Sequence, residues 1–157
     1  ILNQYEGKIK YSSLKLEKSF DFGKWTLDNS IIYQMIDQND DILNLPQFMS
    51  RNTLFFSERI FRNTLAIQTG INFKIFSKYY ANEYNPLISD FHIQNEKKIG
   101  SFPLFDFFFN AKIRQTKIFI IAEHINSSFT GNNFYSTPES VYRDFGVRFG
   151  FKWNLFN

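Results

Sequence analysis

The fold is decided by the stretch DFGVRFGFKWNLF, residues 144–156. From 145 to 155 its odd positions carry Phe, Val, Phe, Phe, Trp and Leu, whereas the even positions from 144 to 154 carry Asp, Gly, Arg, Gly, Lys and Asn. A β-strand sends successive side chains to opposite faces, so one face is apolar and the other polar or bare. The stretch therefore predicts a long amphipathic strand.

Two earlier segments, 65–78 and 106–114, repeat this alternation. We expect seven strands in all, near residues 9–22, 25–38, 47–60, 64–80, 103–114, 117–126 and 141–156. Short turns are predicted at Gly23-Lys24, Phe61-Arg62-Asn63 and Gln115-Thr116, and long polar stretches at 38–46, 81–102 and 127–140. Transmembrane barrels alternate short periplasmic turns with long extracellular loops. The sequence predicts an all-β, antiparallel transmembrane β-barrel.

A soluble β-barrel or sandwich would show the same period of two, with its apolar face turned inward. Three features favour the membrane: aromatic residues crowd the apolar faces, full charges stand at mid-strand, and the strands exceed the usual five to six residues. The longest apolar runs, such as 118–122, are too short for a transmembrane helix, which needs about 18 residues.

Composition narrows the alternatives. Phe occurs 21 times, which favours a β-rich protein. The chain has no Cys, so disulfides and thiolate metal sites are excluded. The net charge is only +3, and Lys and Arg are scattered along the sequence rather than clustered, so we expect no nucleic-acid partner. No motif calls for a cofactor.

Seven strands do not close a bacterial barrel, which normally has an even number. An eighth strand could lie in residues 1–8, or further strands could precede Ile1. Because Ile1 is not an initiator Met and no signal peptide follows it, we favour the second alternative. Residues 1–157 are then the C-terminal part of a single outer-membrane β-barrel domain.

Several stretches, in this order and spacing, resemble the putative-porin family of Bacteroidota. They are GINF (70–73) with KYYANEYNP (78–86), FHIQNE (91–96), DFFFNAK (106–112), AEHIN (122–126) and RFGFKWN (148–154). The resemblance covers residues 45–157. It implies an outer-membrane barrel of more strands than seven, without enzyme activity, through which small solutes pass. The implied partners are outer-membrane lipid, the barrel-assembly machinery during insertion, and other envelope proteins.

One feature departs from such barrels, which commonly end in an aromatic residue in phase with the last strand. Here the last residue is Asn157, and Phe156 is out of phase with Trp153 and Leu155. The insertion signal is therefore displaced, or the true C-terminus lies further on.

Neither histidine predicts catalysis or a metal site. His124 has Glu123, Ser127 and Ser128 nearby, but neighbours on one strand point to opposite faces and no third group completes a triad. We interpret His124 as a residue of the barrel rim. His92 lies in a predicted loop without metal-ligand spacing.

The polar residues of the inward face are better candidates for a functional role than the histidines. The candidate lumen-lining residues are Arg51, Arg59, Gln68, Asn72, Lys74, Asp106, Asn110, Lys112, Arg114, Arg148, Lys152 and Asn154. The set is biased positive, and rings of like charge select ions, so a weak preference for anionic solutes is one hypothesis. The alternative is that these side chains are simply hydrated or paired with acids elsewhere.

Other inward and interfacial residues have structural roles in this interpretation. Gly146 and Gly150 make room for neighbouring side chains. The aromatics expected at the membrane interfaces are Trp25, Tyr79, Tyr80, Tyr142 and Trp153. Three hypotheses follow: a porin-like barrel, a structural or accessory barrel with a blocked lumen, and a barrel enzyme acting on lipid. The first is preferred.

Overall fold

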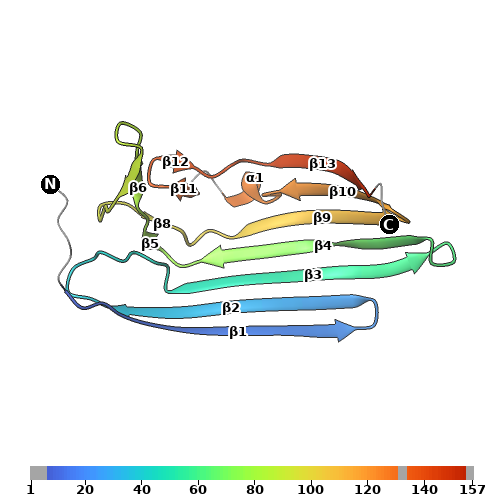
Figure 1. Ribbon diagram of the computed structural model, residues 1–157, viewed down its shortest axis with the longest axis horizontal. Coiled ribbons are helices and arrows are strands. Elements are labelled where there is room, and N and C mark those ends of the chain that lie inside the picture. The colour runs from blue at the N-terminus through green and yellow to red at the C-terminus, as the bar shows by residue number, and fades with distance from the viewer. Residues whose placement is uncertain (1–6, 131–133, 155–157) are drawn as a thin grey trace.

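Seven long antiparallel strands form one sheet, and the loops at one of its ends carry small hairpins (Figure 1). The computed structural model describes residues 7–130 and 134–154. The sheet strands are β1 (Lys10–Phe22), β2 (Trp25–Asp37), β3 (Phe48–Ile60), β4 (Leu65–Phe76), β9 (Leu104–Ile113), β10 (Thr116–Glu123) and β13 (Gly146–Trp153). The loop elements are β5 (Tyr79–Tyr80), β6 (Glu83–Asn85), β7 (Asp90–His92), β8 (Lys98–Ile99), α1 (Ser127–Thr130), β11 (Tyr135–Thr137) and β12 (Ser140–Val141).

The strands pair in chain order, β1-β2-β3-β4-β9-β10-β13. The predicted all-β antiparallel class and the seven strands are therefore confirmed. Gly23 closes the β1–β2 turn at a φ of 68°, and residues 61–63 turn between β3 and β4 with φ values of 50–67°. The third turn lies one residue earlier than predicted, because Arg114 adopts the left-handed conformation at a φ of 51° and Ile113 pairs with Thr116.

The pairing register separates the sheet into two faces, as the alternation predicted. On one face Ile67 of β4 stands opposite Ala111 of β9, and on the other face Gln68 stands opposite Asn110. We call these the apolar face and the polar face. The same alternation continues across β10 and β13, where Ile118 meets Phe151 on the apolar face.

Within the described residues, no second layer packs on the apolar face. Only six apolar residues of the described chain are buried, and most of these lie at the loop end, whereas Phe149 and Phe151 are 82% and 74% exposed. An exposed apolar surface this extensive marks contact with a membrane or with another protein. The sheet is thus built to place one face in an apolar environment.

The sheet is open rather than closed into a barrel, with β1 and β13 as its edges. The seven strands were expected to be too few for closure, and the predicted barrel is not seen. The reason is geometric: strand β1 and strand β13 pair on one side only, so no hydrogen bonds join the two edges within the described residues. The described residues also contain no helix that is long and apolar enough to cross a membrane.

The main buried cluster lies among the loops instead of under the sheet. Phe102, Leu104 and Phe134 form it, with Phe76 and Tyr142 packed against them. Leu104 and Phe76 belong to the polar face by register, since Leu104 pairs with Lys74 and Phe76 pairs with Met49. The loops between β4 and β9 and between β10 and β13 therefore fold over the polar face at its loop end.

Candidate functional site

The polar face collects most of the candidate lumen residues. Successive pairings place ten of the twelve on it: Arg51, Arg59, Gln68, Asn72, Lys74, Asp106, Asn110, Lys112, Arg148 and Lys152. Two lie elsewhere. Arg114 forms the β9–β10 turn, and Asn154 follows the last residue of β13, with its backbone N–H donating to Gln115 at 3.2 Å.

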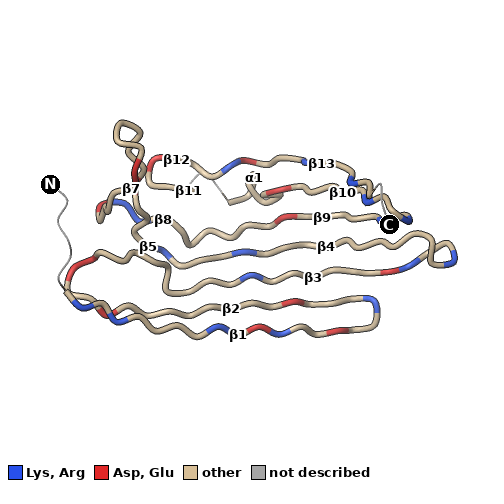
Figure 2. The backbone as a smooth tube through the Cα atoms, in the orientation of Figure 1, with Lys and Arg blue, Asp and Glu red and all other residues tan. Residues whose placement is uncertain are grey.

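Four cations of the polar face stand in one row across the sheet, and we call them the basic row. Arg59 of β3 pairs with Ala66 of β4, and Ala66 pairs with Lys112 of β9. Lys112 pairs in turn with Lys117 of β10, and Lys117 pairs with Lys152 of β13. Residues scattered along the sequence are thus clustered in space. Figure 2 shows the concentration of basic residues at the turn end of the sheet.

The basic row has no acidic partner in the part of the chain that the structure describes. None of its four side chains joins an ion pair there, and all four are exposed. Sequence reasoning missed Lys117. The predicted turn itself placed Lys117 on the same face as Lys112, which was a signal available from the sequence.

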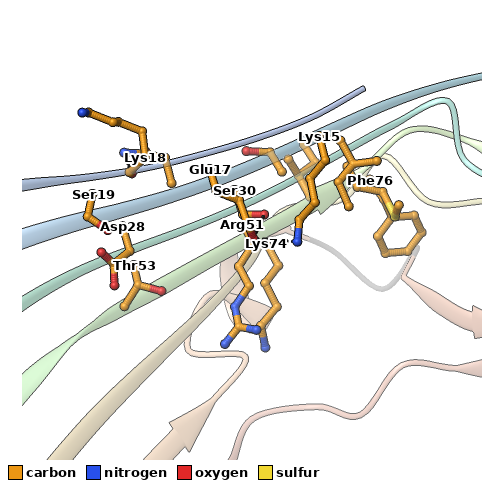
Figure 3. Close-up of a pocket in the computed structure, with 15 residues that line it drawn as sticks. Lys15, Glu17, Lys18, Ser19, Asp28, Ser30, Arg51, Thr53, Lys74 and Phe76 are labelled. Atoms are coloured by element: carbon orange, nitrogen blue, oxygen red, sulfur yellow. Dashed lines mark hydrogen bonds and ion pairs between the residues drawn. The ribbon is translucent and has the colours of Figure 1, made fainter. Parts of the chain in front are cut away.

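A second basic group lies nearer the loop end, in a groove of about 780 Å³. Arg51 and Lys74 are direct cross-strand neighbours, and Figure 3 shows their side chains extending side by side. The Lys74 ammonium binds Asp106 at 2.6 Å, and Lys15 binds Glu17 at 2.7 Å. Two of the four cations that line this groove are therefore compensated by described carboxylates, whereas none of the basic row is.

Asp106 organises the loop end of the polar face. It is only 6% exposed, and its carboxylate accepts hydrogen bonds from the Lys74 ammonium and from the backbone N–H of His124, the latter at 3.0 Å. A buried carboxylate needs such donors because desolvation disfavours its charge. Asp106 therefore joins strand β4 to the start of the loop after β10.

His124 lies at the base of that loop and is fully buried. Its ring makes edge contacts with Phe134 and Tyr142, at centroid distances of 4.5 and 5.6 Å, and its Nδ1 lies 2.8 Å from the carbonyl oxygen of Arg143. Its Nε2 has no partner among the described atoms. The structure places His124 at the loop end of the sheet, where its ring contacts are aromatic, and its position at a barrel rim stays a prediction.

Two glycines of the polar face lie where a Cβ would meet a neighbour closely. A Cβ on Gly150 would lie 2.7 Å from the Phe119 ring, and one on Gly70 would lie 2.2 Å from the Leu54 carbonyl oxygen. The expectation that Gly150 makes room for a neighbour is confirmed. It is wrong for Gly146, where the nearest atom is 4.0 Å away, because no large side chain of β10 covers the end of that strand.

In the loops, the carboxylate of Glu83 lies close to the His92 ring. Glu83 Oε2 lies 3.5 Å from His92 Nε2 across the small β6–β7 hairpin. A hydrogen bond with Glu139 raises the pKa of Glu83, burial and the negative charges of Glu139 and Glu96 raise it further, and His92 acts in the opposite sense. Nothing resembling a metal-ligand cluster occurs in residues 7–130 and 134–154.

The expected interfacial aromatics divide into two groups. Trp25 and Trp153 are 49% and 61% exposed at the turn end, where Trp25 packs on Phe56 with ring centroids 5.4 Å apart. Tyr142 instead packs into the loop cluster, because the chain between β12 and β13 folds back over Phe102. Burial raises the pKa of Tyr79, which lies at the loop end. Phe156 and Asn157 lie outside the described residues.

The amphipathic antiparallel sheet, with short turns at one end and folded loops at the other, has the strand pattern of outer-membrane barrels, while its two edges are not joined. The comparison of the chain with known families agrees. A family model described as "Putative porin" matches residues 1–157, and the chain belongs to this family. No curated protein and no solved structure matches it. A Bacteroidota origin stays a prediction.

Proposed function

We propose that the chain is the C-terminal part of an outer-membrane β-barrel through which small solutes pass. The observation that carries the proposal is the pairing of an exposed apolar face with a charged, grooved polar face on the same strands. Lipid would cover the first face and water the second. Family membership supports the same assignment.

Closure of the barrel is part of the proposal. An open sheet edge exposes unpaired backbone N–H and C=O groups, each of which costs several kcal/mol in hydrocarbon. Strands β1 and β13 therefore need further strands beside them, supplied by a larger barrel. The short turns then face the periplasm and the long loops face outward.

Five of the seven sheet strands reach the length that a bilayer needs, and β10 and β13 are shorter. β1, β2 and β3 each have 13 residues, whereas β10 and β13 have eight. Transmembrane strands need about 9–11 residues when tilted. The short pair ends at the loop end, where the His124 ring packs against Phe134 and Tyr142.

Conductance is the direct test. The full-length protein, inserted into a planar bilayer, is expected to give stepwise current in KCl. Under a salt gradient the reversal potential should show preferential passage of chloride, because the polar face carries an excess of cations. Cation selectivity would refute the anion preference, and absence of current would refute the open pore.

A structural or accessory barrel with a blocked lumen is the second candidate. The loop cluster favours it, since Phe134 and Tyr142 pack over the polar face at the outer end. Such a barrel would give no current and would co-purify with envelope proteins in detergent. Deleting residues 127–140 would distinguish a loop plug from an interior block, since only the first would open the pore.

The proposal assigns no catalytic residue. A lipid-directed enzyme would need His124 as a base, and the His124→Ala variant would then lose lipid hydrolysis. We expect no hydrolysis by either protein in a mixed-micelle assay with phospholipid.

A further inference from the structure

The basic row lies beside a groove that is suited to anions. The groove has a volume of about 410 Å³ and runs along the turn end of the polar face over β3, β4, β9 and β10. Its polar lining is formed by Ser57, Arg59, Gln68, Asn110, Lys112 and Lys117. Lys152 extends the same row by one strand.

Like charges stand directly opposite each other in this row. Lys112 faces Lys117 and Lys117 faces Lys152, so three ammonium groups lie on three consecutive strands. Neighbouring strands are about 4.8 Å apart, so the three lysines span roughly 10 Å. Directly opposed like charges destabilise a sheet, and this sheet brings no carboxylate to offset them within the described residues. A bound anion would offset these charges.

The one acidic residue bordering the groove is already engaged. Glu58 belongs to the apolar face by register, and its carboxylate binds the Lys24 ammonium. The amide groups of Gln68 and Asn110, which are opposite each other one row further in, make no hydrogen bond with another described residue. They offer neutral donors next to the four cations.

From this placement we propose that the basic row is a binding site for small multivalent oxyanions, at the turn end of the pore. The proposal rests on the proposed function for the direction in which the polar face points. Three lysines act as mobile point charges for phosphate or carboxylate oxygens, and Arg59 can bind two oxygens at once. An anion carrying two or more charged groups reaches several of these cations together, which a chloride ion cannot do.

The Lys74–Arg51 groove is a weaker candidate for the same role. Lys74 is held by Asp106 and Lys15 by Glu17, so an incoming anion would have to compete with these carboxylates. The basic row has no such competitor in the described chain. The site is therefore assigned to the turn end.

The test is calorimetric titration of the full-length protein, folded in detergent, with pyrophosphate and separately with citrate. Both should bind, and KCl should weaken binding because it screens the charges. The double variant K112Q/K117Q should lose affinity by about tenfold or more, because each charge-assisted bond is among the strong ones. Binding of pyrophosphate alone would restrict the ligand to phosphates, and binding of citrate alone to carboxylates.

The matched control is K8Q/K78Q, which removes the same charge from two exposed lysines at the loop end. It should bind as the unchanged protein does, and so should K112R/K117R. If K8Q/K78Q lost as much affinity as K112Q/K117Q, the effect would be one of net charge, and the proposed site would be overturned. Failure of both anions to bind the unchanged protein would also overturn it. Calorimetric titration does not depend on conductance. A protein that binds pyrophosphate but gives no current would therefore refute the open pore without refuting the oxyanion site.

Discussion

The two ends of the sheet differ in side-chain packing and in charge compensation. At the loop end, Phe102, Phe134 and His124 pack together, and Asp106 compensates the nearby Lys74. At the turn end, tight turns with left-handed residues leave the basic row open to the groove. The loop end is stabilised by its own contacts, whereas the turn end carries uncompensated charge.

This difference indicates where each property of the protein resides. Packed aromatic side chains hold the loops over the polar face at the loop end. Under the proposed function, the exposed cations at the other end would act on anionic solutes. Stability should therefore depend mainly on the loop end, and ion preference on the turn end.

Phe134→Ala should have the largest effect on stability. Phe134 is 3% exposed and contacts both His124 and Phe102, so its truncation should destabilise the loop packing by about 3–5 kcal/mol. Amide hydrogen exchange of the folded protein in detergent would measure this in residues 98–104 and 134–145. Phe129→Ala is the control, because Phe129 is 89% exposed. Equal protection in the two variants would show that the cluster does not hold the loops.

The glycines of the polar face should tolerate alanine to different degrees. Gly70→Ala should cost about 1–3 kcal/mol, because its Cβ would meet backbone atoms that cannot move aside. Gly150→Ala should cost less, since the Phe119 ring can rotate away, and Gly146→Ala should be close to neutral. Urea unfolding in phospholipid vesicles would rank the three, and a neutral Gly70→Ala would contradict the close approach.

Lys117→Gln should stabilise the turn end slightly. It removes two directly opposed like-charge contacts, so at low salt and without multivalent anions the free energy of unfolding should rise by about 0.2–1 kcal/mol. The gain should shrink as KCl is added. Lys78→Gln, at the loop end, should show no such gain. A loss of stability in Lys117→Gln would mean that an unseen acid pairs with this lysine.

The loop end should have a weak pH dependence of its own. Because the pKa of Glu83 is raised in the folded protein, the folded state holds its proton more tightly than the unfolded state does. The contact with Glu139 is then most stable at acid pH and weakens as the pH rises above 4.5, the ordinary value of a glutamic acid. Hydrogen exchange in residues 83–92 should reveal this, and Glu139→Gln should remove it.

The sheet itself could be predicted closely because alternation and turn residues are local signals. β2 was expected at 25–38 and runs over Trp25–Asp37, since the Gly23 turn fixes its start. The strand expected at 64–80 ends at Phe76, because the Phe48 N–H donates to the Ser77 hydroxyl instead of continuing the backbone ladder. The last strand begins only at Gly146, because Tyr142 is drawn into the loop cluster.

The site was less accessible to sequence reasoning. Ten candidate residues share a face because the period of two separates the polar from the apolar positions of each strand, and the polar positions of paired strands lie opposite one another. The basic row, by contrast, depends on the register between strands, which the sequence does not state. The contacts of His124 depend on where two separate loops fold, so no local pattern could predict its burial.

The central claim is that the two faces of the sheet meet different solvents, and neighbouring residues of one strand test it most directly. The chain has no Cys, so Ile67→Cys and Gln68→Cys each introduce a single thiol, one on the apolar face and one on the polar face. In proteoliposomes, the thiol of the Gln68→Cys variant should react with a charged, membrane-impermeant reagent, whereas the thiol of the Ile67→Cys variant should resist it. A fluorophore at position 67 should be quenched by brominated lipid. Reaction of both thiols with the charged reagent, or lipid quenching at position 68 instead of 67, would contradict the account.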